Sequence, residues 1–149
     1  MKNKFIIWAA GIVDGEGCIR AAKRKALGTY GEKSPRYNWY LQVKMTHKPA
    51  IKFLAKNFRC GTITKEKPGK FSKRVAWKWI ASGQKMADIL NMLLPYLIVK
   101  RDEALAFINF WNKKVPTVAV KLGVPRVSLA LRERLYQRLR SLKQREWKQ

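Results

Sequence analysis

Residues 9–17 read AAGIVDGEG and end an apolar segment that begins at Phe5 and contains no proline. This segment predicts a helix that is apolar nearly all round and therefore deeply buried, with Gly15 as its C-cap. Asp14 and Glu16 lie at the C-terminal end of the helix, where the helix dipole disfavours negative charge by about 0.3–1 kcal/mol per exposed group. Some further interaction must therefore favour these two acids.

Two explanations of the acids are open on the residues alone. In the first, Asp14 caps a turn or pairs with one of the 33 Lys and Arg side chains, which is the common fate of such an acid. In the second, a carboxylate held on the buried helix end coordinates Mg²⁺, a cation that prefers oxygen ligands and can activate water to attack a phosphodiester. The spacing alone slightly favours the first.

The composition indicates a folded protein with a polyanionic partner. The 149 residues include 33 Lys and Arg against 9 Asp and Glu, a formal net charge of +24. Repulsion at this charge disfavours a compact chain unless a polyanion neutralises it, which indicates nucleic acid or an anionic membrane surface. Hydrophobic residues make up 47% and aromatic residues 11%, which is too many for a solvated basic tail.

Other protein classes are disfavoured by what the chain lacks. Cys18, Cys60 and the one histidine do not have the spacing of a zinc site. So few cysteines fit a reducing cytosol or organelle interior better than secretion. The N-terminus imitates a signal peptide, but acids interrupt the apolar run and no small-x-small cleavage site follows. No later segment reaches the ~20 apolar residues of a membrane span, so we expect a soluble, intracellular protein.

Two pairs of segments alternate between apolar and polar residues with the period of a β-strand. The first pair is 18–25 and 36–45, joined by a long loop with turn residues, and the second is 61–67 and 74–81, joined through Pro68-Gly69. In each pair one face is apolar and is expected to pack on the core. The opposite, basic and polar face carries Arg20, Arg24, Arg36, Asn38, Tyr40, Gln42, Lys44, Thr64, Glu66, Arg74 and Lys78.

The spacing of apolar residues predicts further helices near 51–58, 86–93 and 101–111. The order helix, two strands, helix, two strands, helix is an internal αββ duplication in pattern. Helices on the shared apolar side of two hairpins define an α+β fold. Residues 113–149 carry 11 basic and 2 acidic residues. We expect them to form a basic helical appendage packed on a core of residues 1–112.

The stretch AAGIVDGEG resembles the signature of the LAGLIDADG homing endonucleases, with Ala9 for the first Leu, Gly15 for the second Ala and Glu16 for the second Asp. The αββαββα pattern of that family covers residues 5 to about 112. Residues 95–100, PYLIVK, resemble the family's segment that carries a catalytic lysine. The resemblance implies the homing-endonuclease fold, with an antiparallel sheet that binds DNA.

The resemblance also implies roles for particular residues. Glu16 is expected to bind Mg²⁺ together with the backbone carbonyl of Gly15, and Asp14 is a weaker ligand candidate. Lys100 is expected to orient the attacking water or to stabilise charge on the scissile phosphate.

One position departs from the family pattern. The family often has a water-orienting Gln near the end of the second strand, and Met45 occupies that position here. Which residue replaces the Gln is open. His47 is expected to be a surface residue at a helix start rather than a catalytic base.

A single motif implies a homodimer, in which two motif helices cross closely at the small residues Ala10 and Gly11. The two Glu16 carboxylates would then meet near the two-fold axis, and bound divalent ions would relieve their repulsion. The DNA target would be pseudo-palindromic because the protein is two-fold symmetric.

The implied activity is Mg²⁺-dependent, site-specific cleavage of double-stranded DNA, with a staggered break across the minor groove, in the setting of intron or intein mobility. The sheet would lie in the major groove, where Arg reads guanine and Asn or Gln reads adenine. The polar-face residues named above are the candidate contacts, and we expect half of them to contact only phosphates or solvent. Glu66 could accept a hydrogen bond from cytosine, while Arg138 and Arg140 of the appendage are expected to contact phosphates.

Two other functions compete with this one. A non-cleaving nucleic-acid binder of the same fold, such as an RNA maturase or a DNA-binding regulator, is disfavoured because Glu16 and Lys100 are retained. A basic structural RNA-binding protein of ribosomal type would need neither an acid at a helix end nor a long sequence-specific face.

Overall fold

The structure is a computed structural model that describes residues 2–25, 35–68, 74–113 and 128–146. In chain order its elements are α1 (Lys2–Glu16), β1 (Gly17–Arg24), β2 (Arg36–Met45), α2 (Lys48–Phe58), β3 (Thr62–Glu66), β4 (Ala76–Ser82), α3 (Gly83–Leu93), the 3-10 turn η2 (Leu94–Tyr96), α4 (Arg101–Asn112) and α5 (Leu129–Glu146).

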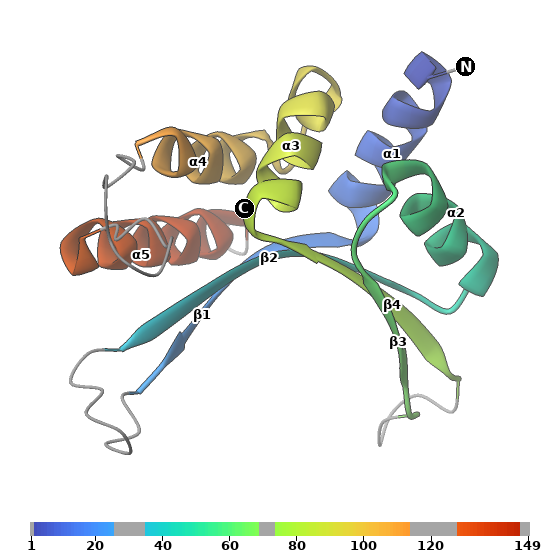
Figure 1. The fold of residues 1–149 in the computed structure, drawn as a ribbon, viewed down its shortest axis with the longest axis horizontal. Helices are drawn as coiled ribbons and strands as arrows, with labels where there is room; N and C mark the ends of the chain where they lie inside the picture. Colours follow the sequence, from blue (N-terminus) through green and yellow to red (C-terminus); the bar gives the residue numbers. More distant parts are fainter. Residues whose placement is uncertain (1, 26–34, 69–73, 114–127, 147–149) are drawn as a thin grey trace, which may run out of the picture.

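The four strands form one antiparallel sheet in the order β1-β2-β4-β3. The sheet is bent like a saddle, and all the helices lie on its convex side (Figure 1). No described helix covers the concave side, which is therefore left to solvent or to a partner. The fold is α+β in the αββαββα order that the sequence predicts, with α4 and α5 added at the end.

The core lies between the convex face of the sheet and the helices. Leu41, Val43 and Trp79 of the sheet are fully buried, and α1 contributes Ala9 and Val13 to the same cluster. These sheet residues belong to the face that the alternating pattern assigns to the core, so the predicted strand faces are confirmed. The concave face is correspondingly free for polar side chains.

The prediction that the first helix is buried all round is wrong. Ile7 is 53% exposed and Gly11 is also exposed, so one side of α1 remains uncovered in the single chain. The helix also continues to Glu16, so Gly15 lies in its last turn and is not its C-cap. Apolar composition indicates burial, but it does not tell whether the covering surface belongs to the same chain.

Two glycines permit close contacts that fix how the chain turns. A Cβ atom on Gly17 would lie 2.4 Å from the backbone oxygen of Val13, so only glycine lets β1 leave α1 this abruptly. Gly61 has φ of +87°, and a Cβ there would lie 2.2 Å from the indole nitrogen of Trp79. That indole nitrogen donates a hydrogen bond to the Cys60 carbonyl at 2.9 Å, which fastens the start of β3 to β4.

The observed elements differ from the predicted ones mainly at their ends. The fourth strand begins at Ala76 instead of residue 74. Most of the long loop between the first two strands, and Gly69 of the second turn, lie outside the described residues. Among the described helices, none combines the length and hydrophobicity that a membrane-spanning segment needs.

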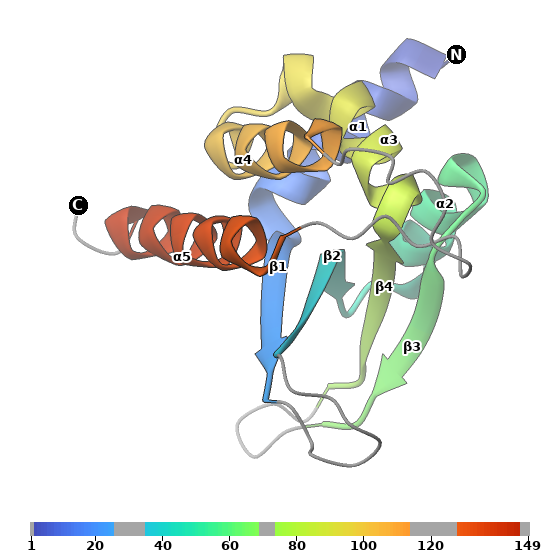
Figure 2. The same ribbon diagram turned by 60° about the vertical axis from the view of Figure 1, so that its left-hand side comes forward.

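The last helix, α5, packs against the rest of the described chain. Leu135, Leu139 and Leu142 of α5 are buried, and α5 lies alongside α4 and the edge strand β1 (Figure 2). Leu129, the first residue of α5, is 44% exposed and contributes little to this contact.

Candidate functional site

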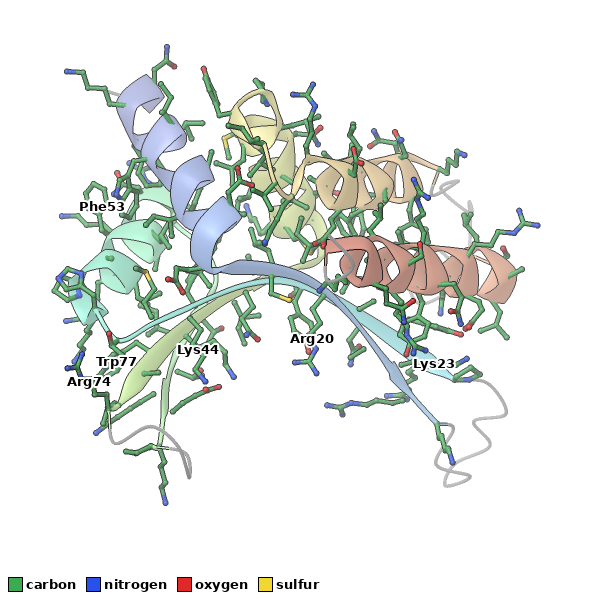
Figure 3. All side chains as sticks on the ribbon, turned by 180° about the vertical axis from the view of Figure 1, so that it is seen from behind. Arg20, Lys23, Lys44, Phe53, Arg74 and Trp77 are labelled. Atoms are coloured by element: carbon green, nitrogen blue, oxygen red, sulfur yellow. The ribbon has the colours of Figure 1, made fainter. Side chains whose placement is uncertain are left out.

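The polar residues predicted on one face of the strands do share the concave face. The register pairs Arg20 with Tyr40, Asn38 with Ala22 and Arg24 with Arg36 across β1 and β2. Because strand residues alternate between faces, these positions are on the side opposite buried Ile19 and Leu41. Figure 3 shows Arg20 and Lys44 on the side of the sheet away from the helices. The concave face carries Arg20, Arg24, Arg36, Asn38, Tyr40, Gln42, Lys44, Thr64, Glu66 and Lys78, with Arg74 just before β4.

Cationic side chains are paired directly across strands on this face. Arg24 is the cross-strand partner of Arg36, and Lys44 is the partner of Lys78. Like charges directly opposite one another destabilise a sheet. A face built in this way is suited to an anionic ligand, because bound phosphates would relieve the repulsion.

Glu66 relieves part of this repulsion within the protein. Its Oε2 atom lies 2.5 Å from the Lys44 ammonium, and its Oε1 atom accepts a hydrogen bond from the Lys78 ammonium. Hydrogen bonds from Lys44 and then Lys78 lower the pKa of Glu66 to about 2. The carboxylate is therefore ionised throughout the physiological pH range and holds both lysines in place.

Asp14 connects the end of α1 to the start of α4. Its Oδ2 atom accepts a hydrogen bond from the backbone N–H of Ile98 at 2.7 Å, and its Oδ1 atom accepts one from the backbone N–H of Lys100 at 3.0 Å. Lys100 is the N-cap of α4, where the helix dipole favours a negative charge. These hydrogen bonds explain why an acid is tolerated at the end of α1. They use both carboxylate oxygens of Asp14 to join the two helices.

Lys100 is held at the same helix end by its own side chain. Its Nζ atom donates a hydrogen bond to the backbone oxygen of Asp14 at 3.2 Å, which satisfies one of the carbonyls left unpaired at the end of α1. The structure therefore brings Lys100 to the turn that contains Gly15 and Glu16.

Glu16 differs from Asp14 in having no partner in the described part of the chain. It is exposed, it is the last residue of α1, and it makes no hydrogen bond or ion pair with any described residue. It borders a hollow of about 550 Å³ that is also lined by Lys44, Met45, Thr46, His47, Lys67, Arg74 and Ala76. An unpaired carboxylate beside several cations is free to bind a metal ion.

The hollow contains both residues that the sequence placed near the end of the second strand. His47 is the N-cap of α2, as expected for a residue at a helix start, and its Nδ1 atom accepts a hydrogen bond from the backbone N–H of Ala50 at 3.3 Å. A ring that accepts at Nδ1 carries its proton at Nε2 and is a donor there. Of Met45 and His47, only His47 can therefore donate a hydrogen bond into the hollow beside Glu16. The sequence predicted only a surface position for His47 and did not suggest this role.

A metal ion would fit this site only with additional ligands. No group of three or more His, Cys, Asp or Glu side chains is gathered around one point in the described residues. Mg²⁺ typically takes one or two protein carboxylates and completes its six ligands with waters and substrate phosphates. Glu16 with the Gly15 carbonyl fits this pattern if a second chain and a bound phosphate supply further oxygens.

The two residues expected at the helix crossing are not equivalent. Ala10 is completely buried within its own chain and cannot touch a second one. Gly11 is exposed, as is Gly15 one turn later, and a Cβ atom at either position would meet nothing within 4 Å. Ala10 is therefore excluded from a crossing surface, and the uncovered stripe of α1 is Ile7, Gly11 and Gly15.

Arg138 and Arg140 lie away from the concave face, on α5. Arg138 lines a groove of about 450 Å³ between α4 and α5. Arg140 lies 5.7 Å from the centre of the Tyr136 ring, and Lys143, one turn further, places its Nζ atom 3.1 Å from Cys18 Sγ on β1. Arg140 therefore lies on the side of α5 that faces the edge of the sheet, whereas Arg138 lies on the side that faces the groove against α4.

Sequence reasoning missed the residue that fastens α5 to the sheet. Glu133 pairs with Lys23 of β1 at 2.8 Å and accepts hydrogen bonds from Tyr37 of β2 and Gln137. Hydrogen bonds from Lys23, Tyr37 and Gln137 lower the pKa of Glu133 to about 2. Its isolation among many arginines of the appendage was the available signal, because an acid in such a place needs a specific partner.

Comparison with known proteins supports the same conclusion for the fold. No protein-family model and no curated protein matches the sequence. The homing endonuclease I-CvuI in complex with the I-CreI target DNA is similar, with a TM-score of 0.63 and 23% identity over 95% of this chain and 96% of that chain. The archaeal intron-encoded homing endonuclease I-Vdi141I complexed with DNA gives 0.63 and 10% identity over 97% of this chain and 99% of that one.

A third similar structure is that of a protein more than twice as long as this chain. The I-SmaMI LAGLIDADG homing endonuclease bound to cleaved DNA has a TM-score of 0.59 and 16% identity over 93% of this chain but only 42% of that chain. The protein thus has the fold of a DNA-binding endonuclease, and its structural neighbours are LAGLIDADG homing endonucleases. Its length of 149 residues fits the single-motif type of that fold.

Proposed function

We propose that this protein is a site-specific endonuclease that cleaves double-stranded DNA as a homodimer, with Mg²⁺ bound at the interface of the two chains. The observation that carries the proposal is that Glu16 and the Lys100 ammonium group both lie at the end of α1. Glu16 is exposed and has no partner among the described residues. The Lys100 ammonium group donates a hydrogen bond to the backbone carbonyl of Asp14, which precedes Glu16 by two residues. A free carboxylate beside a fixed ammonium group is suited to hydrolysis of a phosphodiester.

The substrate is assigned from the concave face. Its cations and its amide and hydroxyl groups offer both phosphate contacts and hydrogen bonds to base edges, which together define sequence-specific binding of duplex DNA. Structures of I-CvuI and I-Vdi141I with this fold contain DNA, which supports the same use of the sheet here. The bent sheet would follow the major groove and bring the ends of α1 close to the DNA backbone.

The homodimer is assigned from the uncovered stripe of α1. Ile7 is 53% exposed, and Gly11 and Gly15 add two positions where a second helix can approach closely. Ile98 and Val99, beside the end of the same helix, are 85% and 57% exposed. A second copy that crosses at this stripe would cover the apolar residues and bring two Glu16 side chains together.

Each residue at the site then has a definable task. Glu16 and the Gly15 carbonyl would hold Mg²⁺, which when bound activates water and neutralises charge on the scissile phosphate. Lys100 would donate to a phosphate oxygen or to the attacking water, since two of its three ammonium protons remain available. His47 would donate from Nε2 and help to order water in the hollow beside Glu16.

The experiment that tests this function starts from randomised duplex DNA. Duplexes bound by the purified protein are selected and sequenced, and the selected DNA is incubated with protein and Mg²⁺, and in parallel with EDTA. We expect a pseudo-palindromic consensus and a staggered double-strand break that EDTA prevents. DNA across an intron-insertion junction is a natural second substrate.

A non-cleaving nucleic-acid binder is the second candidate. The crystal structure of I-CvuI in the presence of Mg contains DNA that is not cleaved, so this fold can hold a target without breaking it. Sequence-specific binding with no cleavage in Mg²⁺ or Mn²⁺ would favour this candidate over the endonuclease.

We also propose a division of the chain and a cellular location. Residues 1–112 would form the endonuclease core and 113–149 a basic appendage on it. An intracellular location agrees with the two cysteines, Cys18 and Cys60, which form no disulfide.

A further inference from the structure

Glu66 is the single acidic side chain on the four strands of the described sheet. It lies on the concave face of a protein whose net charge is +24. A carboxylate on a surface that binds DNA is repelled by phosphates, so its presence there must serve contacts of another kind.

Glu66 and its two lysines form a fixed row of hydrogen-bonding groups. The Lys44 ammonium lies 2.5 Å from Oε2, and the Lys78 ammonium donates to Oε1, so each carboxylate oxygen holds a different lysine. The three residues come from the three neighbouring strands β2, β4 and β3. Along the hydrogen bonds, and not in strand order, the Glu66 carboxylate connects the two ammonium groups, so the row presents a donor, an acceptor and a donor.

The row retains the capacity to bind a further molecule. The side chains of Lys44, Lys78 and Glu66 are 50%, 22% and 30% exposed. Among the described residues each ammonium group uses one of its three protons, and a carboxylate that accepts two hydrogen bonds keeps about two of its four acceptor sites. Both lysines are restrained by Glu66, so they are less free to reach for phosphates.

We propose that Lys44, Glu66 and Lys78 act as one base-reading unit that selects an A·T or T·A pair in the major groove. The inference rests on the proposed function and deepens it, because it names what one part of the sheet recognises. Adenine N7 and thymine O4 are acceptors on either side of the adenine N6 amine, so an A·T pair displays acceptor, donor, acceptor. This pattern is the complement of the row.

A G·C pair fits the same row less well. Guanine N7 and O6 are both acceptors and only cytosine N4 is a donor, so the order is acceptor, acceptor, donor. The Glu66 carboxylate in the middle would then face the O6 lone pairs. The contact to cytosine that the sequence suggested for Glu66 alone is therefore disfavoured once the flanking lysines are included.

Glu66 would act as a positioning residue as well as an acceptor. Lys44 and Lys78 are cross-strand partners, and without the carboxylate their repulsion would push them apart. Lysines freed in this way would donate to phosphates, or to the paired acceptors of guanine. Loss of Glu66 is thus expected to change base preference rather than simply to weaken binding.

The test is a binding selection that does not depend on cleavage. Randomised duplex DNA is selected in EDTA with the wild-type protein, with Glu66→Gln and with Lys65→Gln, and the bound duplexes are sequenced. Lys65 is the control because it is an exposed lysine on the same strand whose position alternates to the other face. Circular dichroism confirms that each variant is folded.

For the wild-type protein and Lys65→Gln we expect A·T or T·A at two symmetry-related positions. For Glu66→Gln the preference at those positions alone should disappear or change to G·C, with a shift of about tenfold in relative affinity between duplexes that differ there. An unchanged consensus with Glu66→Gln, or G·C at the affected positions in the wild type, overturns the inference while the proposed function stands. Absence of any wild-type consensus overturns both.

Discussion

Lys100 donates two hydrogen bonds to Asp14, one from its backbone to the Asp14 side chain and one from its side chain to the Asp14 backbone. The backbone N–H of Lys100 donates to Asp14 Oδ1 at 3.0 Å, and the Lys100 ammonium donates to the backbone oxygen of Asp14 at 3.2 Å. The end of α1 and the start of α4 are thereby joined across 86 positions of sequence. The same contact that stabilises the fold also fixes the ammonium group beside Gly15 and Glu16.

This relationship predicts that Asp14 and the Lys100 side chain have separable roles. Asp14→Ala should destabilise the protein by about 1–3 kcal/mol, because two backbone N–H groups would be left without a charged acceptor. Lys100→Met should cost much less stability but should abolish cleavage. Thermal unfolding and cleavage of the selected DNA, measured on both variants, check this division. An Asp14→Ala protein of normal stability would show that the hydrogen bonds to Ile98 and Lys100 contribute little.

Glu16→Gln is expected to abolish cleavage and to leave DNA affinity nearly unchanged. In the proposed function the phosphate and base contacts on the sheet would supply the binding, whereas the carboxylate would serve only the metal. Affinity is measured by gel shift in EDTA and cleavage in Mg²⁺. Asp102→Asn is a matched control, because Asp102 is also an exposed acid at a helix end but lies in the first turn of α4. Cutting at a near-normal rate by Glu16→Gln would remove Glu16 from the metal site.

How far the sequence predicts this molecule depends on how local the deciding contact is. The polar and apolar faces of the strands were predicted because alternation is a property of neighbouring residues, as Leu41 and Gln42 illustrate. A capping role for Asp14 was one of the two explanations that the sequence left open, but its partner Ile98 was not predicted because it lies 84 positions away. Glu133 was missed for the same reason, since its contact with Lys23 spans 110 positions.

The buried face of α1 illustrates a second limit. Ala10 and Gly11 are adjacent small residues, and composition alone assigns both to a helix crossing. Only the packing separates them, because Ala10 is buried by its own chain and Gly11 is left exposed. In the sequence, small or apolar residues that remain exposed in the single chain cannot be distinguished from residues of the core.

Gly11→Leu should prevent dimerisation and cleavage without unfolding the chain. A Cβ atom at this position meets nothing within 4 Å in the single chain, and Gly11 is exposed, so we expect a larger side chain to collide only with a second copy. Replacing a helical glycine should, if anything, stabilise α1, by up to about 1 kcal/mol. Sedimentation at micromolar concentration measures the oligomeric state, and thermal unfolding measures stability.

Ala10→Leu provides the contrast to that variant. Because Ala10 is fully buried, added volume there should destabilise the monomer by about 1–3 kcal/mol. A Gly11→Leu protein that still sediments as a dimer and still cuts DNA would refute the crossing at this stripe.

The attachment of α5 should depend on pH through Glu133. Its pKa of about 2 lies below the ordinary value of 4.5, so the ionised form is favoured in the folded protein. The stabilisation is therefore complete above about pH 4.5 and is lost as pH falls toward 2. Glu133→Gln should lower the thermal midpoint at pH 7, and its difference from the wild type should shrink across that acid range. A difference that stays constant from pH 7 to pH 2 would contradict the ion pair.

The last prediction concerns the two arginines of α5 that were expected to contact phosphates together. Arg140 follows the edge of the sheet with Lys143, close to β1, whereas Arg138 lines the groove against α4. DNA bound on the concave face can be reached from the sheet edge more readily than from that groove. Arg140→Ala should therefore weaken binding to all sequences alike.

The salt dependence of affinity distinguishes the two positions. Removal of one phosphate contact reduces the slope of log affinity against log salt by roughly one unit. Arg140→Ala should show that reduction, while Arg138→Ala should keep the wild-type slope, and neither should change the selected base sequence because phosphate contacts carry no base identity. Binding is measured at several salt concentrations with the selected duplex and with an unrelated duplex. An equal reduction of the slope in both variants would mean that DNA wraps over α5 as well as the sheet, and a changed consensus in either would assign base recognition to the appendage.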